Sequence, residues 1–352
     1  IIGAGIFALP SVFRTAGLST GFFYLGLALI AYIFIYLMYA DIIASTKGDH
    51  RFVGYARIHL GEGWSWLAIL MTIVEALFVL TIYLILSQSF GHLITDFGGG
   101  IEKMLIFWVL SSAAIFLGFR LLANLEFAIA IGTVAIIAII AGLAITDGRF
   151  LGDISFNSQI LDYFLPLAPI LFALSGRVAI PMIMKFKGVA KKTIIWGTII
   201  SAVLYAVFVL SILALSPAVS EDAVSGLIGF VPAWALVAIG VLGFLELFSS
   251  YIIIGYDAHK SMELDLKFPK FLSFSIAIIA PVALYFAGFS RFLELVSFVG
   301  GIFIALESIL IVIMWMKVKK TTLIKKPLLA LLIFLFEAVL LYEIIKYISK
   351  LL

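Results

Sequence analysis

Cysteine is absent from this sequence of 352 residues, and charged residues are scarce. Without cysteine, the chain can form neither a disulfide framework nor a thiolate metal site. Its four histidines, His50, His59, His92 and His259, show no ligand spacing, so a zinc or haem site is not expected. Only 12% of the residues are charged, about half the share of an ordinary globular domain. The chain therefore lacks the features of a soluble, metal-dependent or disulfide-dependent domain.

Hydrophobic residues make up 64% of the sequence and gather in long runs, for example 21–40, 193–219 and 271–290. Each run is close to the ~20 residues that span the hydrocarbon core of a bilayer. Because a soluble core cannot absorb this excess, lipid is the expected solvent. The sequence opens with Ile1-Ile2-Gly3 inside what reads as a membrane segment, so we expect further residues before it and an incomplete first helix.

Apolar runs between polar breaks predict an all-α polytopic membrane protein with eleven transmembrane segments. The positive-inside rule favours a cytoplasmic N-terminus, because this orientation places sixteen of the 23 Lys and Arg residues on the cytoplasmic side. We expect the protein in the cytoplasmic membrane of a prokaryotic cell. The predicted segments are 1–17, 20–43, 64–92, 104–119, 122–146, 163–185, 192–216, 231–257, 270–288, 291–317 and 327–349.

The run Gly3 to Pro10 aligns with the run Leu174 to Pro181, and the two prolines are 171 positions apart. The same offset places Glu75 on Glu246. Five helices separate the two runs, so the second copy enters the membrane from the opposite side. The sequence thus predicts inverted five-helix halves at 1–146 and 163–317, plus an additional helix at 327–349. Small residues also serve close helix packing, but the placement in the first helix of each half favours a repeat.

Pro10 and Pro181 cannot donate a backbone hydrogen bond, so both helices are expected to unwind near mid-membrane. Freed N–H groups suit a carboxylate, whereas freed carbonyls suit a cation or an ammonium group. We expect 3–6 and 174–177 to be non-helical and to face each other across a site for a zwitterionic amino acid. For Tyr83 the alternative to lining this site is packing at a helix interface. The expected substrate residues are Gly3, Ala4, Gly5, Ile6, Phe172, Leu174, Ser175, Gly176, Tyr83 and Ser249.

Three stretches carry a family resemblance. Residues 3–17 and 172–181 resemble the first and sixth helices of the amino acid/polyamine/organocation (APC) superfamily, in particular the aromatic and hydroxy amino acid permeases and the auxin-permease-like amino acid transporters. Residues 191–197 are similar to the loop that leads into their seventh helix. The resemblance implies the fold of the bacterial leucine transporter, with substrate between helices one and six and against helices three and eight.

The resemblance also bears on ion coupling. Ser249 and Ser250 lie in a stretch similar to the one that sodium-coupled members of this fold use for sodium, although serines in membrane helices more often bond to backbone. Arg177 stands where the resembling tryptophan and tyrosine permeases carry histidine. Their proton coupling and aromatic substrate are therefore not carried over.

Glu75, Glu246 and Glu307 lie deep in predicted helices, where a charge costs about 2.5–3.5 kcal/mol. Glu75 and Glu246 are candidates for proton coupling, or one of them neutralises Arg177. For Arg177 three roles compete: clamping a substrate carboxylate, replacing a coupling cation, or forming a bridge. We favour a bridge to Glu75 or Glu246, because a guanidinium stays charged and needs an anionic partner.

Together these features predict a secondary transporter that carries an amino acid by alternating access, with a proton favoured over sodium as coupling ion. The alternative is an amino acid sensor of the same fold that does not transport. An enzyme is not expected, because no Ser/His/Asp set or His-x-x-x-His motif appears at helical spacing. The expected partners are a small amino acid and the lipid bilayer, with no cofactor and no nucleic acid. The oligomeric state and the particular amino acid stay open.

Overall fold

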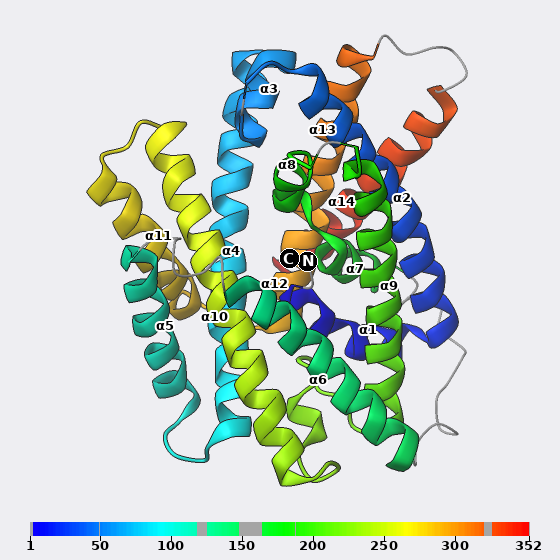
Figure 1. Ribbon diagram of the computed structural model, residues 1–352, viewed down its shortest axis with the longest axis vertical. Helices are drawn as coiled ribbons and strands as arrows, with labels where there is room; N and C mark the ends of the chain where they lie inside the picture. Colours follow the sequence, from blue (N-terminus) through cyan, green and yellow to red (C-terminus); the bar gives the residue numbers. More distant parts are fainter. Residues whose placement is uncertain are drawn as a thin grey trace.

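The computed structural model describes residues 3–48, 50–117, 125–147, 164–186, 188–319 and 326–351, and helices form all the regular structure of these ranges (Figure 1). The expected breaks at 119–122 and 146–163 fall largely outside the described residues, as do residues 1 and 2. The elements are η1 (Ala4–Ala8), α1 (Leu9–Ala16), α2 (Leu18–Ser45), α3 (Phe52–Leu60), α4 (Glu62–Ile94), α5 (Gly100–Leu117), α6 (Leu125–Asp147), α7 (Leu167–Leu174), η5 (Arg177–Ala179), α8 (Ile180–Ile183), α9 (Ala190–Leu215), η6 (Ser225–Leu227), α10 (Ala233–Leu264), α11 (Lys270–Phe286), α12 (Phe292–Phe298), η7 (Val299–Ile304), α13 (Ala305–Val318) and α14 (Lys326–Leu351).

The prediction of an all-α polytopic membrane protein is confirmed. Within the described ranges, six helical spans are long and apolar enough to cross a membrane, and shorter apolar helices lie between them. In its described residues, every one of the eleven predicted segments coincides with one helix or with two or three consecutive helical elements. The first and sixth segments are each interrupted, and the tenth changes from α-helix to π-helix and back.

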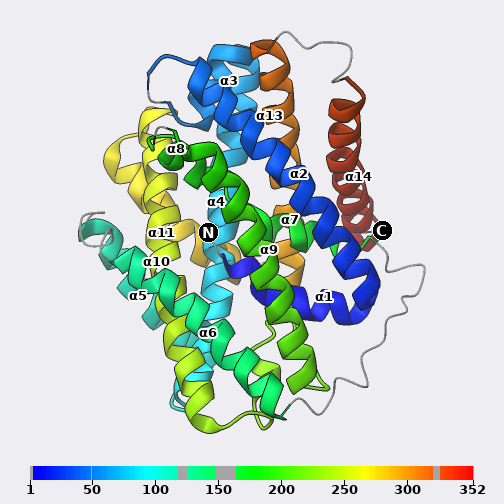
Figure 2. The ribbon, with the colours of Figure 1, turned by 45° about the vertical axis from the view of Figure 1, so that its right-hand side comes forward.

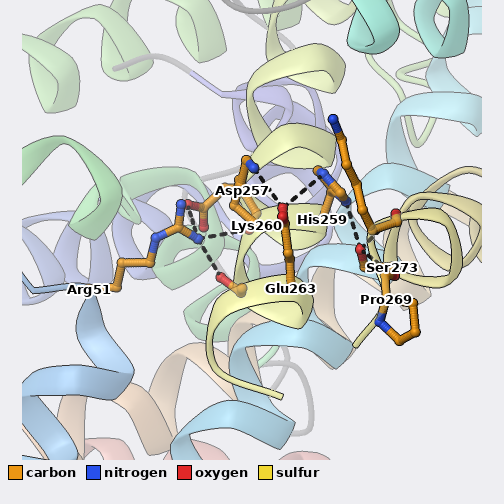
Figure 3. Close-up of polar contacts among 9 residues, drawn as sticks. Arg51, Asp257, His259, Lys260, Glu263, Pro269 and Ser273 are labelled. Atoms are coloured by element: carbon orange, nitrogen blue, oxygen red, sulfur yellow. Dashed lines mark hydrogen bonds and ion pairs between the residues drawn. The ribbon is translucent and has the colours of Figure 1, made fainter. Parts of the chain in front are cut away.

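The helix α3 lies in a stretch that the sequence analysis treated as a loop. Its buried residues, among them Phe52, Tyr55 and Ala56, recur at helical spacing, so a short amphipathic helix docks on the bundle. Arg51, just before the helix, forms an ion pair with Asp257 of α10 at 3.5 Å, and Figure 3 shows this contact. No segment was predicted here, because nine residues are too few to stand out in a search for membrane spans.

Two long helices, α4 and α10, run side by side through the height of the bundle (Figures 1 and 2). Two glycines of α10 allow this close approach. A side chain at Gly243 would collide with the ring of Phe90, and one at Gly240 would come within 2.9 Å of Leu93 Cβ. This pair of helices carries the two acids that the repeat pairs, Glu75 on α4 and Glu246 on α10.

The tenth predicted segment contains a π-helix, η7, between α12 and α13. Its two adjacent glycines contact different neighbours. A side chain at Gly300 would collide with the carbonyl of Ala168 in α7, whereas one at Gly301 would collide with the side chain of Glu343 in α14. The π-helix is thus wedged between α7 and the additional C-terminal helix, which lies at the edge of the bundle in Figure 2.

We expect Gly300→Ala to destabilise the protein by about 1–3 kcal/mol, the usual cost of forcing an extra group into a packed site. The physical reason is that the Ala168 carbonyl belongs to helix backbone and cannot move aside as a flexible side chain would. Thermal unfolding of the purified protein in detergent measures the effect. Gly142→Ala, in α6 with no atom within 4 Å of the added carbon, is the control and should not lower stability. Equal melting temperatures for both variants would contradict the close packing of η7 on α7.

Candidate substrate site

The two predicted helix breaks have the same local structure. Pro10 and Pro181 each occupy the second position of an α-helix, where a missing N–H does no harm. The carbonyls that the prolines would have bonded accept instead from the preceding residue, Leu9 N–H to Ile6 and Ile180 N–H to Arg177. Both α-helices are therefore preceded by a tight 3₁₀ turn, and their first residues are 171 positions apart, as in the sequence repeat.

The expectation of wholly non-helical segments was wrong in part. Only Gly3 is extended in the first break, because the 3₁₀ turn begins at Ala4. In the second break Leu174 still ends α7, Ser175 is extended, and a 3₁₀ turn begins at Arg177. A 3₁₀ turn bonds backbone groups three residues apart and so leaves fewer of them unpaired than an extended chain does.

The first break contacts the end of α7 directly. A Cβ at Gly5 would lie 2.5 Å from Ala173 Cα and 2.7 Å from the ring of Phe172. Ala4 and Ile6 are buried on either side of this contact. The two breaks therefore touch at Gly5, and a bulky residue there would disturb the packing as well as any ligand.

Two tyrosines of α2 hydrogen-bond to the end of α7. The hydroxyl of Tyr32 donates to the Leu171 carbonyl at 2.8 Å, and that of Tyr36 donates to the Leu174 carbonyl at 2.6 Å. The Tyr36 hydroxyl also accepts from the N–H of Gly176, inside the break. One side chain thus pairs a carbonyl and an N–H that the interruption would leave unpaired.

A third tyrosine, Tyr205 of α9, completes the set. Its hydroxyl donates to the Ala173 carbonyl at 2.7 Å and lies close to the backbone of Gly3 in the first break. The Phe172 carbonyl accepts from the N–H of Ser175 at 3.1 Å. The four carbonyls at the end of α7, which have no partner within the helix, are consequently all hydrogen-bonded.

Arg177 forms an ion pair with Glu307 of α13, and both side chains are almost buried, at 12% and 7% exposure. The guanidinium also lies over the ring of Phe52, 4.6 Å from its centre, in a cation–π contact. The predicted bridge exists, but the prediction of its partner was wrong: Glu307 takes the place that we assigned to Glu75 or Glu246. Helix spacing cannot show which of three deep acids faces a residue on another helix.

Glu75 lies close enough to Arg177 and Glu307 to interact with both electrostatically, and its side chain is partly exposed. It makes no ion pair within the part of the chain that the structure describes. Asp257, paired with Arg51, adds a weaker interaction from the end of α10. The second break therefore has two deep carboxylates for one guanidinium, which leaves an excess of negative charge unless a proton or a cation joins them.

Glu246 lies near the first break rather than the second. It is buried at 4% exposure, beside the hydroxyl of Thr133 in α6, and interacts electrostatically with Tyr83 and Tyr205. Glu75, on α4 of the first half, thus lies near the second break, and Glu246, on α10 of the second half, lies near the first. The two environments differ because the position of Arg177 corresponds to Ile6 in the first half.

The two serines proposed for sodium lie on α10. Ser249 is buried, and Ser250 lies close to the hydroxyl of Tyr83 on α4. Among the described residues no group of three or more His, Cys, Asp or Glu side chains could hold a metal ion. Sodium binding at the two serines stays a prediction.

Of the predicted substrate residues, only Leu174 and Gly176 line a cavity of about 170 Å³ that lies between α8 and α9. Sequence reasoning missed the three tyrosines and the part that Glu307 plays. A signal was present, because tyrosines in the middle of an apolar helix need a partner for their hydroxyl groups. Tyr32 and Tyr36 are one helical turn apart, which indicates a shared polar face.

The apolar spans, the two breaks and the buried charges between them define an integral membrane protein with a leucine-transporter-like fold. The chain is similar in structure to MhsT in complex with L-phenylalanine, with a TM-score of 0.67, 13% sequence identity, and coverage of 97% of this chain and 95% of that one. At this identity the likeness shows the fold alone. No protein-family model matches the sequence, and no curated protein does.

Tyr36→Phe should lower stability by roughly 1–3 kcal/mol for each buried backbone group that loses its partner, here the Leu174 carbonyl and the Gly176 N–H. Thermal unfolding in detergent measures the loss. Tyr24→Phe, on the same helix, removes a partly exposed hydroxyl that makes no hydrogen bond to the described residues, and it should be neutral. Equal effects of the two substitutions would show that the hydroxyl of Tyr36 does not support the break.

Glu307→Gln should destabilise the protein by about 3–5 kcal/mol, because it leaves the guanidinium of Arg177 buried without a counter-charge. Glu75→Gln should cost much less, since Glu75 has no direct partner in the described structure. The double variant Arg177→Met/Glu307→Leu should recover most of the loss. Melting temperatures of the four proteins decide the matter, and a greater loss in Glu75→Gln than in Glu307→Gln would contradict the pairing.

Proposed function

We propose that this chain is a secondary transporter of the APC superfamily type, which carries an amino acid across the membrane by alternating access. The observation that carries the proposal is the meeting of two interrupted helices, α1 with η1 and α7 with α8, in the middle of the bundle (Figure 1). Interrupted helices of this kind present backbone donors and acceptors to small charged substrates. MhsT, which shares the fold, was solved with L-phenylalanine, and this supports an amino acid as the substrate class.

The substrate carboxylate is proposed to bind the N–H groups of Ala4 and Gly5, the first of the η1 turn, which have no partner within that turn. The backbone of Gly3 is a weaker candidate, since the hydroxyl of Tyr205 lies beside it. The ammonium group would bind at the end of α7, where each carbonyl oxygen keeps a second lone pair. Phe172, Ser175, Tyr83 and Ser249 are proposed to form the side-chain pocket.

A proton is the proposed coupling ion, and Glu75 is its proposed carrier. Glu75 is the partly exposed member of a buried group that has one more carboxylate than guanidinium. Protonation of Glu75 would remove the excess charge, whereas a charged Glu75 would compete with Glu307 for Arg177. Protonation of Glu75 would thereby affect where Arg177 lies in the second break. This break is the segment expected to move during transport.

The test uses the purified chain in proteoliposomes, with labelled L-phenylalanine and a panel of other amino acids as probes. We expect uptake that a proton gradient accelerates, and competition by amino acids but not by phenethylamine, which lacks the carboxylate. Glu75→Gln should abolish the acceleration by the gradient. Glu337→Gln, in an exposed position of α14, is the matched control and should keep it.

Three results would change the proposal. Acceleration by a sodium gradient alone would move the coupling site to Ser249 and Ser250. Binding without uptake for every amino acid would favour the sensor of the same fold. Equal competition by phenethylamine would exclude carboxylate recognition by the first break.

A further inference from the structure

The cavity between α8 and α9 is partly open, and its wall on α9 includes exposed residues. Its α9 wall includes Thr193, Gly197 and Ser201, which recur every fourth residue and therefore lie on one face of the helix. Thr193 and Gly197 are exposed, and α9 is one of the helices that qualify as membrane spans. From Thr193 to Ser201 this face extends about 12 Å along the helix axis. The cavity is thus a recess that runs from the start of α9 toward the middle of this helix.

The recess has an apolar character, although several of its residues carry hydroxyl groups. Thr193 donates to Val189 O at 3.1 Å, Thr198 to Ile194 O at 2.8 Å, and Ser201 to Gly197 O at 2.9 Å. The hydroxyl of Tyr36 donates to the end of α7. Every side-chain hydroxyl of the wall thus donates its hydrogen bond to a backbone carbonyl. No hydroxyl donor of the wall is free to bind a carboxylate. The other lining side chains are Leu174, Ile180, Ile183 and Ile194.

The volume of about 170 Å³ is in the range of apolar cavities that stay dry and accept small hydrocarbons. An amino acid zwitterion would lose its hydration in this recess without gaining new hydrogen-bond donors. A hydrocarbon chain has no polar groups whose hydration would be lost, so its entry does not carry this cost. The recess therefore suits a lipid chain and not the transported substrate.

Two lysines are close in sequence to lining residues of the recess, Ile183 and Thr193. Lys192 directly precedes Thr193, and Lys185 follows α8; both are exposed, and neither makes an ion pair with another described residue. The neighbouring Lys191 is different, because it is paired with Asp41 at 2.7 Å. The start of α9 adds the positive end of a 26-residue helix dipole at the same place. Next to Lys185, the ring of Phe186 is 68% exposed, as expected for an aromatic residue at a membrane surface.

We propose that the recess and the two free lysines form a binding site for one anionic phospholipid. The phosphate lies between Lys185 and Lys192 at the start of α9, and one acyl chain extends past Gly197 into the recess between α8 and α9. The inner end of the recess reaches Leu174 and Gly176, so the chain packs against the second helix break. Bound lipid therefore holds α8 in its present position, independently of whether the protein transports or senses an amino acid.

The test uses the full chain in detergent, with phosphatidylglycerol and phosphatidylcholine as probes, and follows lipid retention by native mass spectrometry and stability by thermal unfolding. We expect one tightly retained phosphatidylglycerol and a higher melting temperature with this lipid than with phosphatidylcholine. Lys185→Gln and Lys192→Gln should each weaken phosphatidylglycerol binding about fivefold, the effect of one lysine at an anionic surface.

Gly197→Phe tests the recess itself. A Cβ at this position meets no atom within 4 Å, so the ring would enter the space meant for the acyl chain without a clash at its base. We expect this variant to lose the retained lipid and the stabilisation by phosphatidylglycerol. Gly142→Phe is the control, since it adds the same ring at another exposed helical glycine with open space around it. If Gly197→Phe does not fold, Gly197→Leu makes the same test with a smaller side chain.

Retention and stabilisation that are unchanged in Gly197→Phe would overturn the proposal. Loss in the lysine variants alone would show contact with the headgroup at the membrane surface and no chain in the recess, which also contradicts it. Equal stabilisation by phosphatidylcholine would exclude a role for the two lysines in recognition. Loss in Gly197→Phe and in both lysine variants, with binding kept in Gly142→Phe, is the result that supports it.

Discussion

The structure depends on one constraint, the need to satisfy the backbone of a helix that ends inside the membrane. The last four carbonyls of any helix lack partners within it, and each unpaired group in hydrocarbon costs several kcal/mol. At the end of α7 the hydroxyls of Tyr32, Tyr36 and Tyr205 and the N–H of Ser175 supply these partners. The tyrosines come from α2 and α9, so both helices are held in register with the break that they support.

This arrangement makes the two breaks unequal. Each carbonyl at the end of α7 already accepts one hydrogen bond from the protein itself, whereas the first N–H groups of the η1 turn have no acceptor within that turn. An anionic group would therefore find more free N–H donors at the first break. The second break has the stronger charges instead, because the repeat places Arg177 where the first half has Ile6. The inverted halves share the 3₁₀ turn before a proline-containing α-helix, but only the second break contains a charged side chain, Arg177.

The charges at the second break depend in turn on the π-helix. Glu307 follows η7 by three residues, and the extra residue in a π-turn rotates everything after it relative to a regular α-helix. Adjacent glycines hold this turn against α7 on one side and α14 on the other. Glu343, fully buried where it contacts Gly301, is neutralised by Lys346 at 3.1 Å within the same helix. The C-terminal helix thus packs against the segment that orients the partner of Arg177.

The membrane class, the eleven segments and both helix breaks could be predicted from the sequence, because they follow from local properties: apolar length, and the inability of Pro10 and Pro181 to donate a hydrogen bond. The deep acids were visible for the same reason. Only the tertiary structure decided that Arg177 pairs with Glu307, that tyrosines of two other helices complete the end of α7, and that α3 is a helix. Such pairings depend on which faces of distant helices meet, and a helical repeat shows only which residues share a face.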